Sequence, residues 1–164
     1  MDTINIKIAG LGGMGVLSAS FVLAEAAFIA GYDVKKAEVH GMSQRGGSVA
    51  SDIRFGDRVL SPMIPGGEVD YLVAIAPEWA DMHRAELRVT GKMLTPADVE
   101  GFANKRALNV VLMGALSRLL PIPEAAWLDA LAKGFPAKLH ESNLAAFQFG
   151  REKIEPPTLQ PSQN

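Results

Sequence analysis

Apolar and polar positions alternate along the first forty residues in the way that strands and helices require. Isoleucine alternates with polar residues from Ile4 to Gly10, the pattern of a half-buried strand that stops at a glycine. The segment from Val16 to Ala30 is rich in Ala and Leu and is followed by Gly31, as in a helix with a glycine C-cap. A second strand is predicted from Tyr32 to His40. This order is typical of the start of an open, mostly parallel α/β sheet.

The following segments depart from a plain alternation of strands and helices. Residues 48–55 alternate with a period of two, and the Gly56-Asp57 pair predicts a hairpin turn into a further short strand. A buried strand is expected from Asp70 to Pro77, and the apolar segments after residue 105 predict C-terminal helices. The expected fold is therefore α/β, a Rossmann-like open sheet with an inserted β-hairpin.

Length and composition limit the kinds of protein to consider. A chain of 164 residues can form one domain with its own core, and we expect residues 1–152 to form it. Residues 153–164 contain three prolines and are expected to be a disordered tail. Hydrophobic residues make up 48% of the chain, and 16 positions are glycine. This high apolar content suggests a surface that is buried against another protein, although a compact α/β domain is also rich in Val, Ala and Gly.

The charges and the absence of cysteine exclude several partners and cofactors. The net charge is −2 and the cations are not clustered, which argues against nucleic acid as a partner. Without cysteine the chain holds no disulfide, thiolate-bound zinc or iron–sulfur cluster, and we identify no metal ligands. The start lacks the basic region of a signal peptide, and Val16 to Ala30 is too short to span a bilayer. We therefore expect a soluble, cytoplasmic protein that does not contact a membrane.

The first candidate binding segment is a glycine-rich turn. Gly10, Gly12, Gly13 and Gly15 form the pattern G-x-G-G-x-G between the first predicted strand and the first helix. Glycine suits a tight turn there and lets a ligand approach the backbone, and free N–H groups at the helix start suit a phosphate or carboxylate. Close packing of helix on strand explains the same glycines without a ligand. Both interpretations stay open.

The second candidate segment, Gly41 to Ser48, interrupts two predicted strands. Arg45 is its single cation, and a guanidinium can hold a carboxylate or phosphate through two hydrogen bonds. We expect this loop and the glycine turn to meet at the carboxyl ends of the strands, where open α/β sheets bind ligands. The binding candidates in the loop are Ser43, Gln44, Arg45, Gly46 and Gly47.

Three motifs resemble the gamma subunit of the 2-oxoacid:ferredoxin oxidoreductases: GLGGMG, EVHGMSQRGGSV and FGDRVLSPMIP. The chain is most similar to the small (beta) subunit of indolepyruvate ferredoxin oxidoreductase. The resemblance runs from Ile6 to Pro77 and resumes at Arg106 to Leu116 and at Glu141 to Gly150. One strand–helix unit that such subunits contain between Trp79 and Arg106 is shortened or missing here.

The resemblance implies the function and the partners. Enzymes of this family oxidatively decarboxylate a 2-oxoacid to an acyl-coenzyme A, and they pass electrons to ferredoxin. Thiamine diphosphate, magnesium and 4Fe-4S clusters are then expected on partner subunits, with coenzyme A as a candidate ligand of this chain. The isolated chain is expected to be inactive, and a homodimer is one form that it could take.

Two other functions stay open on the residues alone. Glu38 lies where a nicotinamide-binding Rossmann fold places its ribose-binding acid, which would suit a stand-alone nicotinamide- or flavin-binding dehydrogenase. Alternatively, the Gly41–Ser48 loop makes only protein contacts and the chain is a purely structural assembly subunit.

Individual polar and aromatic residues favour structural roles over catalysis. No pair of carboxylates has the spacing of a general acid and base, so we identify no catalytic residue. His40 ends the second predicted strand, where a lone histidine is more often structural. Asn109 and Asn143 lie in segments that resemble the family, and we expect them to fix helices through hydrogen bonds. Surface positions are expected for His83 and His140, and packing or interface positions for Trp79 and Trp127.

Overall fold

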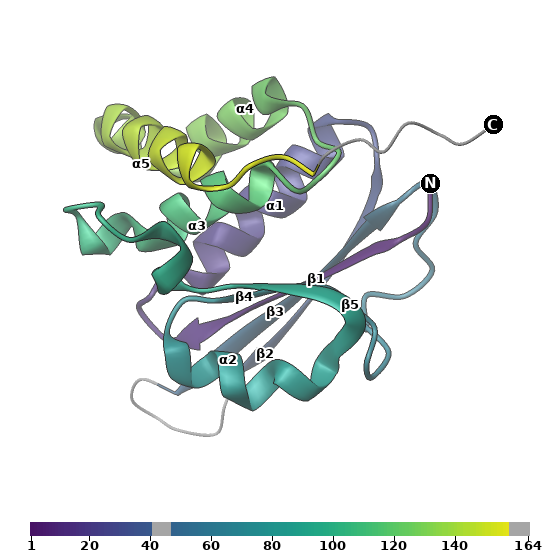
Figure 1. Ribbon diagram of the computed structural model, residues 1–164. Coiled ribbons are helices and arrows are strands. Elements are labelled where there is room, and N and C mark those ends of the chain that lie inside the picture. The colour runs from purple at the N-terminus through teal and green to yellow at the C-terminus, as the bar shows by residue number, and fades with distance from the viewer. Residues whose placement is uncertain (41–46, 158–164) are drawn as a thin grey trace.

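A computed structural model describes residues 1–40 and 47–157, which form a five-stranded sheet with helices on both faces (Figure 1). The strand order is β2-β3-β1-β4-β5. β3 is antiparallel to both of its neighbours, whereas β4 is parallel to β1 and to β5. Four of the five strands therefore run in the same direction, which confirms the mostly parallel α/β sheet. The strands are β1 (Ile4–Leu11), β2 (Asp33–His40), β3 (Ser48–Gly56), β4 (Val69–Ala74) and β5 (Leu87–Leu94).

The helices cover the two faces of the sheet unequally. α1 and α3 lie on one face, α4 and α5 cover them from outside, and α2 packs on the opposite face (Figure 1). Short 3-10 turns join several of these elements: η1 (Arg84–Glu86), η2 (Pro96–Val99), η3 (Lys105–Ala107) and η4 (Ala137–Leu139). No helix in the described part of the chain is both long and apolar enough to cross a membrane. The α-helices are α1 (Val16–Ile29), α2 (Pro77–His83), α3 (Leu108–Ser117), α4 (Glu124–Gly134) and α5 (His140–Lys153).

The alternation of side chains in β1 gives each face of the sheet its own core. Ile6 and Ile8 point to the face under α1 and α3, where they belong to the large hydrophobic core. Ala9 points to the other face and packs in a smaller cluster around Trp79 of α2. The small alanine leaves room for the indole ring, so one short helix is enough to cover this part of the second face.

The expected hairpin that turns at Gly56-Asp57 into a further short strand is wrong, and β3 instead forms a hairpin with the strand before it, β2. β3 pairs with β2 across the preceding loop, with Val34 opposite Phe55 and His40 opposite Val49. Residues 57–68 form no strand. Pro62 and Pro65 lack the N–H that a sheet ladder needs.

Side chains of β2 and β3 hold this segment in place of a sheet ladder. Arg54 donates from one guanidinium nitrogen to the carbonyl oxygens of Ser61 and Met63, at 3.0 and 2.9 Å. The backbone N–H of Val59 donates to the Asp33 carboxylate at 2.8 Å. Residues 57–68 therefore cross the end of β3 as an anchored loop.

The C-terminal helices confirm the sequence expectation. α5 runs to Lys153, and Ile154 packs partly buried against the large core. α3 and α5 cross at Gly114 and Gly150, where an added Cβ would overlap the backbone of the opposite helix. Residues 158–164, most of the expected tail, lie outside the described residues.

Candidate functional site

The glycine turn connects the end of β1 to the start of α1. Gly13 and Gly15 have φ values of +87° and +80°, a left-handed conformation that side chains with a Cβ rarely adopt. Gly15 is the N-cap of α1, and no side chain caps the helix there. A Cβ on Gly10 would lie 3.0 Å from a methyl carbon of Val16, so that glycine allows close packing of helix on strand. The positive φ values at Gly13 and Gly15 fit a tight turn, and Gly10 fits the close packing of helix on strand, whereas ligand binding by the turn stays a prediction.

Asn109 holds the glycine turn from the start of α3. Its side chain is 5% exposed, and Nδ2 donates to the backbone oxygen of Gly15 at 3.2 Å. The expectation that Asn109 fixes a helix by hydrogen bonding is confirmed. Because the amide fills the space beside Gly15, α3 sits directly against the turn.

The second glycine-rich loop also reaches this turn. The backbone N–H of Gly12 donates to the Gly47 carbonyl at 3.1 Å, and Leu11 lies opposite Ser48 in the β1–β3 ladder. The two segments therefore meet at the carboxyl end of β1 as expected. Four of the predicted loop residues lie outside the described residues, and their part in the site stays a prediction: Ser43, Gln44, Arg45 and Gly46.

Two hollows flank the glycine turn and share Gly13. The glycine-turn hollow has a volume of about 320 Å³, and the cationic hollow, between the turn and the start of α3, has about 470 Å³. Leu11, Gly12, Gly13, Gly15, Val16, Leu17, Ser18 and Val49 line the glycine-turn hollow. The cationic hollow is lined by Gly13, Met14, Ile75, Lys105, Arg106 and Leu108.

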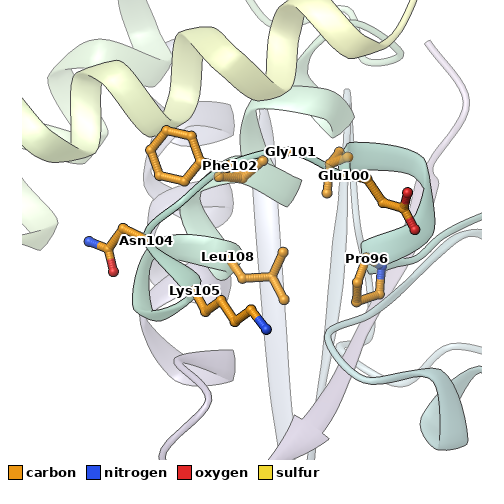
Figure 2. Close-up of a pocket in the computed structure, with 9 residues that line it drawn as sticks. Pro96, Glu100, Gly101, Phe102, Asn104, Lys105 and Leu108 are labelled. Carbon is orange, nitrogen blue, oxygen red and sulfur yellow. The ribbon is translucent and has the colours of Figure 1, made fainter.

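A third hollow continues from the cationic one along the start of α3. This apolar hollow has a volume of about 480 Å³ and shares Lys105 and Leu108 with the cationic hollow. Figure 2 shows Leu108 facing Pro96 across the space, with the Lys105 side chain below Leu108 and the Glu100 carboxylate directed away from it. Its other lining residues are Val99, Gly101, Phe102, Asn104 and Val111.

The charge around the turn favours an anion. Lys105 and Arg106 are exposed, and the first turn of α1 contains no acidic residue. The helix start adds the partial positive charge of its free N–H groups. The Asn104 side chain accepts a hydrogen bond from the Arg106 backbone N–H at 3.1 Å. This bond fixes the backbone of the segment that contains Lys105 and Arg106. Sequence reasoning missed these two residues, because only the packing of α3 brings them to the turn.

Glu38 does not reach the glycine turn. β3 lies between β1 and β2, so Glu38 is two strand spacings, about 10 Å, from β1. Its carboxylate instead pairs with the Lys36 amine at 2.7 Å. This geometry argues against the ribose-binding role that a nicotinamide site would require. His40 at the end of the same strand pairs through its backbone with Val49.

His83 takes part in a polar cluster on the second face of the sheet, so the expected surface position is wrong. Its side chain is 16% exposed, and Nδ1 lies 2.6 Å from the Glu86 carboxylate. Glu86 also pairs with Lys7 at 3.2 Å, and Lys7 contacts Asp52 at 2.6 Å. These contacts attach η1 to β1 and β3. Across residues 1–40 and 47–157, no group of three His, Asp or Glu side chains is arranged to hold a metal ion.

Burial and nearby charges shift the pKa values of Lys7 and Glu86 in opposite directions. Burial alone would lower the pKa of Lys7, but the hydrogen bond to Asp52 and the charges of Asp52 and Glu86 raise it. Burial alone would raise the pKa of Glu86, but the hydrogen bond from His83 and the nearby Lys7 lower it. Lys7 and Glu86 therefore both favour their charged forms, which is typical of a structural ion cluster.

Known proteins with similar sequences identify the family. The sequence pattern of the family called pyruvate ferredoxin/flavodoxin oxidoreductase matches residues 5–153. Indolepyruvate oxidoreductase subunit IorB of Thermococcus kodakarensis is 32% identical over 192 aligned positions, which cover 92% of this chain and 95% of the relative. The alignment is longer than the 164 residues of this chain, so IorB contains segments that this chain lacks.

Two solved structures share the fold. The gamma subunit of a keto/oxoacid ferredoxin oxidoreductase from Geobacter sulfurreducens has a TM-score of 0.78 at 24% identity, over 93% of this chain and 97% of that one. A 2-oxoglutarate:ferredoxin oxidoreductase from Magnetococcus marinus has a TM-score of 0.75 at 22% identity, over 93% of this chain and 31% of that one. The resemblance seen in the motifs is confirmed, and the chain belongs to the pyruvate ferredoxin/flavodoxin oxidoreductase family.

Proposed function

We propose that this chain is the small, gamma-type subunit of a thiamine diphosphate-dependent 2-oxoacid:ferredoxin oxidoreductase of the indolepyruvate type. The observation that carries the proposal is the similarity to subunit IorB over 92% of the chain. The complex would convert a 2-oxoacid to an acyl-coenzyme A and transfer the electrons to ferredoxin. The isolated chain would be inactive, because we find no acid–base pair in its sequence.

The redox and thiamine cofactors fit partner subunits better than this chain. Iron–sulfur clusters need thiolate ligands, and the sequence contains no cysteine. Magnesium at a thiamine diphosphate needs grouped oxygen ligands, and the described part of the chain offers no acidic group of that kind. We therefore assign thiamine diphosphate, magnesium and the 4Fe-4S clusters to partner chains.

Coenzyme A fits the hollows beside the glycine turn. Its phosphate groups would suit Lys105, Arg106 and the free N–H groups at the start of α1. A less polar part of the same molecule would suit the apolar hollow, which begins at Lys105 (Figure 2). When bound, coenzyme A supplies the thiol that accepts the acyl group. The role of this chain would be to bind and orient it.

The outer side of the glycine turn suits a partner subunit. Leu17 and Phe21 of α1 are 41% and 40% exposed, and Leu17 lines the glycine-turn hollow. Adjacent exposed apolar side chains next to a binding turn are typical of an interface. We propose that a thiamine diphosphate-bearing subunit covers this side, next to the Gly41–Ser48 loop. Arg45 would contact that subunit or coenzyme A.

Reconstitution tests the subunit function. The chain is co-expressed with a large subunit that has thiamine diphosphate and cluster motifs, and 2-oxoacid-dependent ferredoxin reduction is measured with and without it. We expect the two chains to co-purify and activity to require both. Full activity of the isolated chain, or of the large subunit alone, would contradict the proposal.

A further inference from the structure

Helices α4 and α5 form an antiparallel pair on the outside of the helical layer (Figure 1). Polar contacts close one end of the pair, where Glu124 accepts from Gln148 at 2.7 Å and pairs with Arg151 at 2.9 Å. The rings of Trp127 and Phe147 pack beside this contact, with centroids 5.9 Å apart. The two helices are therefore firmly joined at the end where α4 begins.

The other end of the same helix pair is open. A hollow of about 200 Å³ lies there between α4 and α5, and it shares no lining residue with the three hollows of the candidate site. We call it the helix-pair hollow. Its lining residues are Leu128, Leu131, Ala132, His140, Asn143 and Leu144.

Asn143 is the unusual residue of this lining. It is 6% exposed, and its Nδ2 has no hydrogen-bond partner among the residues that the structure describes. The sequence-based expectation that Asn143 fixes a helix is therefore not met by its amide nitrogen. A buried donor without a partner lowers the stability of a fold, so such groups need an explanation. Nδ2 itself is buried, but Asn143 lines the hollow and the terminal torsion of asparagine is soft, so rotation about it can bring Nδ2 to the hollow.

His140 already has a hydrogen-bond partner within the chain. Its Nε2 lies 2.8 Å from the backbone oxygen of Phe135, and because a carbonyl oxygen only accepts, Nε2 carries the proton. This bond ties the start of α5 to the end of α4. Asn143 is therefore the donor in the lining that is left for a ligand. The lining contains no Lys, Arg, Asp or Glu, which argues against a charged ligand.

We propose that the helix-pair hollow binds a small neutral molecule with an apolar ring and a carbonyl oxygen that accepts from Asn143 Nδ2. The size supports this class, because an apolar cavity of about 150 Å³ holds benzene in another protein. Leu128, Leu131 and Leu144 supply the apolar contacts. The carbonyl oxygen gives the buried amide the partner that it lacks.

Binding of acetophenone and ethylbenzene to the full chain tests this site. The two molecules have nearly the same shape, but only acetophenone has an acceptor oxygen. Calorimetry should show saturable binding of both molecules. Acetophenone should bind with about threefold to tenfold higher affinity, the difference that one hydrogen bond contributes. In NMR spectra both rings should shift the side-chain amide signal of Asn143, and acetophenone should add the downfield shift of a hydrogen-bonded N–H. Absence of saturable binding, or equal affinities, would overturn the proposal.

Two variants locate the binding. Ala132 is exposed on α4, so Ala132→Trp should fold normally by circular dichroism and fill the hollow, which abolishes binding of both molecules. Asn143→Leu should retain binding and remove the preference for acetophenone. Binding that survives A132W, or a preference that survives N143L, would refute the site. If neither molecule binds and A132W instead prevents assembly with a large subunit, the hollow receives a protein side chain and our proposal is wrong.

Discussion

Asn109 donates a hydrogen bond from Nδ2 to the backbone oxygen of Gly15, across 94 positions of sequence. The bond joins the start of α3 to the N-cap of α1, and this contact places Lys105 and Arg106 beside the glycine turn. The same amide occupies the space that a side chain at position 15 would need. The geometry of the candidate site therefore depends on the fit between one glycine and one asparagine.

Gly15→Ala is expected to destabilise the fold more than Gly13→Ala. Both glycines have left-handed φ values, so backbone strain should cost each variant about 1–2 kcal/mol of unfolding free energy. A Cβ at Gly13 would meet nothing within 4 Å, whereas one at Gly15 would overlap Asn109. Urea titration should show an additional loss of about 1–3 kcal/mol for G15A. Equal losses in the two variants would contradict the close fit.

A double-mutant cycle separates strain from overlap at this position. Asn109→Ala removes the hydrogen bond and the two atoms closest to a Cβ at position 15, and only the Cβ of residue 109 stays, at 3.3 Å. G15A in the N109A background should therefore cost only slightly more than G13A in the wild type. If G15A costs the same in both backgrounds, the overlap with Asn109 does not contribute.

The sequence predicted the parts of the fold that are set by local pattern. β1, α1 and β2 follow from periodicity and from the glycines at their ends, because these signals lie within each segment. The position of β3 between β1 and β2 could not be predicted, since periodicity shows which residues form a strand but not which strand pairs with it. Gly56-Asp57 has the composition of a hairpin turn, but the prolines and Arg54 contacts of the next segment outweigh it.

Only part of the candidate site could be predicted, because local sequence shows the turn but not which distant segment packs against it. Gly12 and Gly13 stand in a recognisable turn between a strand and a helix, so their place in that turn follows from neighbouring residues. Lys105 and Arg106 are two exposed cations before an apolar helix, a pattern with no specific meaning in sequence. They become candidates only because Asn109 docks the start of α3 on the turn.

Lys105→Met and Arg106→Met should weaken the use of coenzyme A by the reconstituted complex. Each variant removes one cation from the hollow beside Gly13 and keeps most of the apolar stem. We expect the KM for coenzyme A to rise about tenfold per variant, the effect of losing about 1.4 kcal/mol of binding. The KM for the 2-oxoacid should stay the same. Lys138→Met, an exposed cation on η4, is the control and should change neither constant.

Steady-state kinetics at several salt concentrations complete this experiment. The wild type should lose affinity for coenzyme A as salt increases, because salt screens the charges of Lys105 and Arg106. Each variant lacks one of these charges and should therefore lose less affinity. An unchanged KM for coenzyme A in both K105M and R106M would exclude the cationic hollow as its phosphate site.

Lys7 should stabilise the fold over a defined range of pH. Its pKa is raised in the fold, so its contribution is complete below about 10.5 and is lost as the pH rises through the folded value. The pKa of Glu86 is lowered, so its contribution is present above about 4.5 and is lost as the pH falls through the folded value. The cluster is therefore fully effective between these limits.

Lys7→Met tests the cluster by urea unfolding at several pH values. At pH 7 we expect a loss of about 2 kcal/mol, less than for a fully buried pair because Glu86 is 40% exposed and screened by solvent. The difference between wild type and K7M should shrink above pH 10.5 and below pH 4.5. Lys138→Met again serves as the control for general charge effects. A difference that is the same at all pH values would show that Lys7 acts through packing alone.

Gly114→Ala and Gly150→Ala should each weaken the crossing of α3 and α5. A Cβ at Gly114 would overlap the backbone oxygen of Phe147, and one at Gly150 would overlap that of Val111. Alanine favours helices over glycine by about 1 kcal/mol, so propensity alone predicts stabilisation, whereas overlap of backbones predicts a loss of about 2–4 kcal/mol. The sign of the change in unfolding free energy therefore decides between the two. Gly66→Ala, which meets nothing within 4 Å, is the control and should stay within about 0.5 kcal/mol of the wild type. Stabilisation by G114A or G150A would mean that the two helices lie further apart than the structure places them.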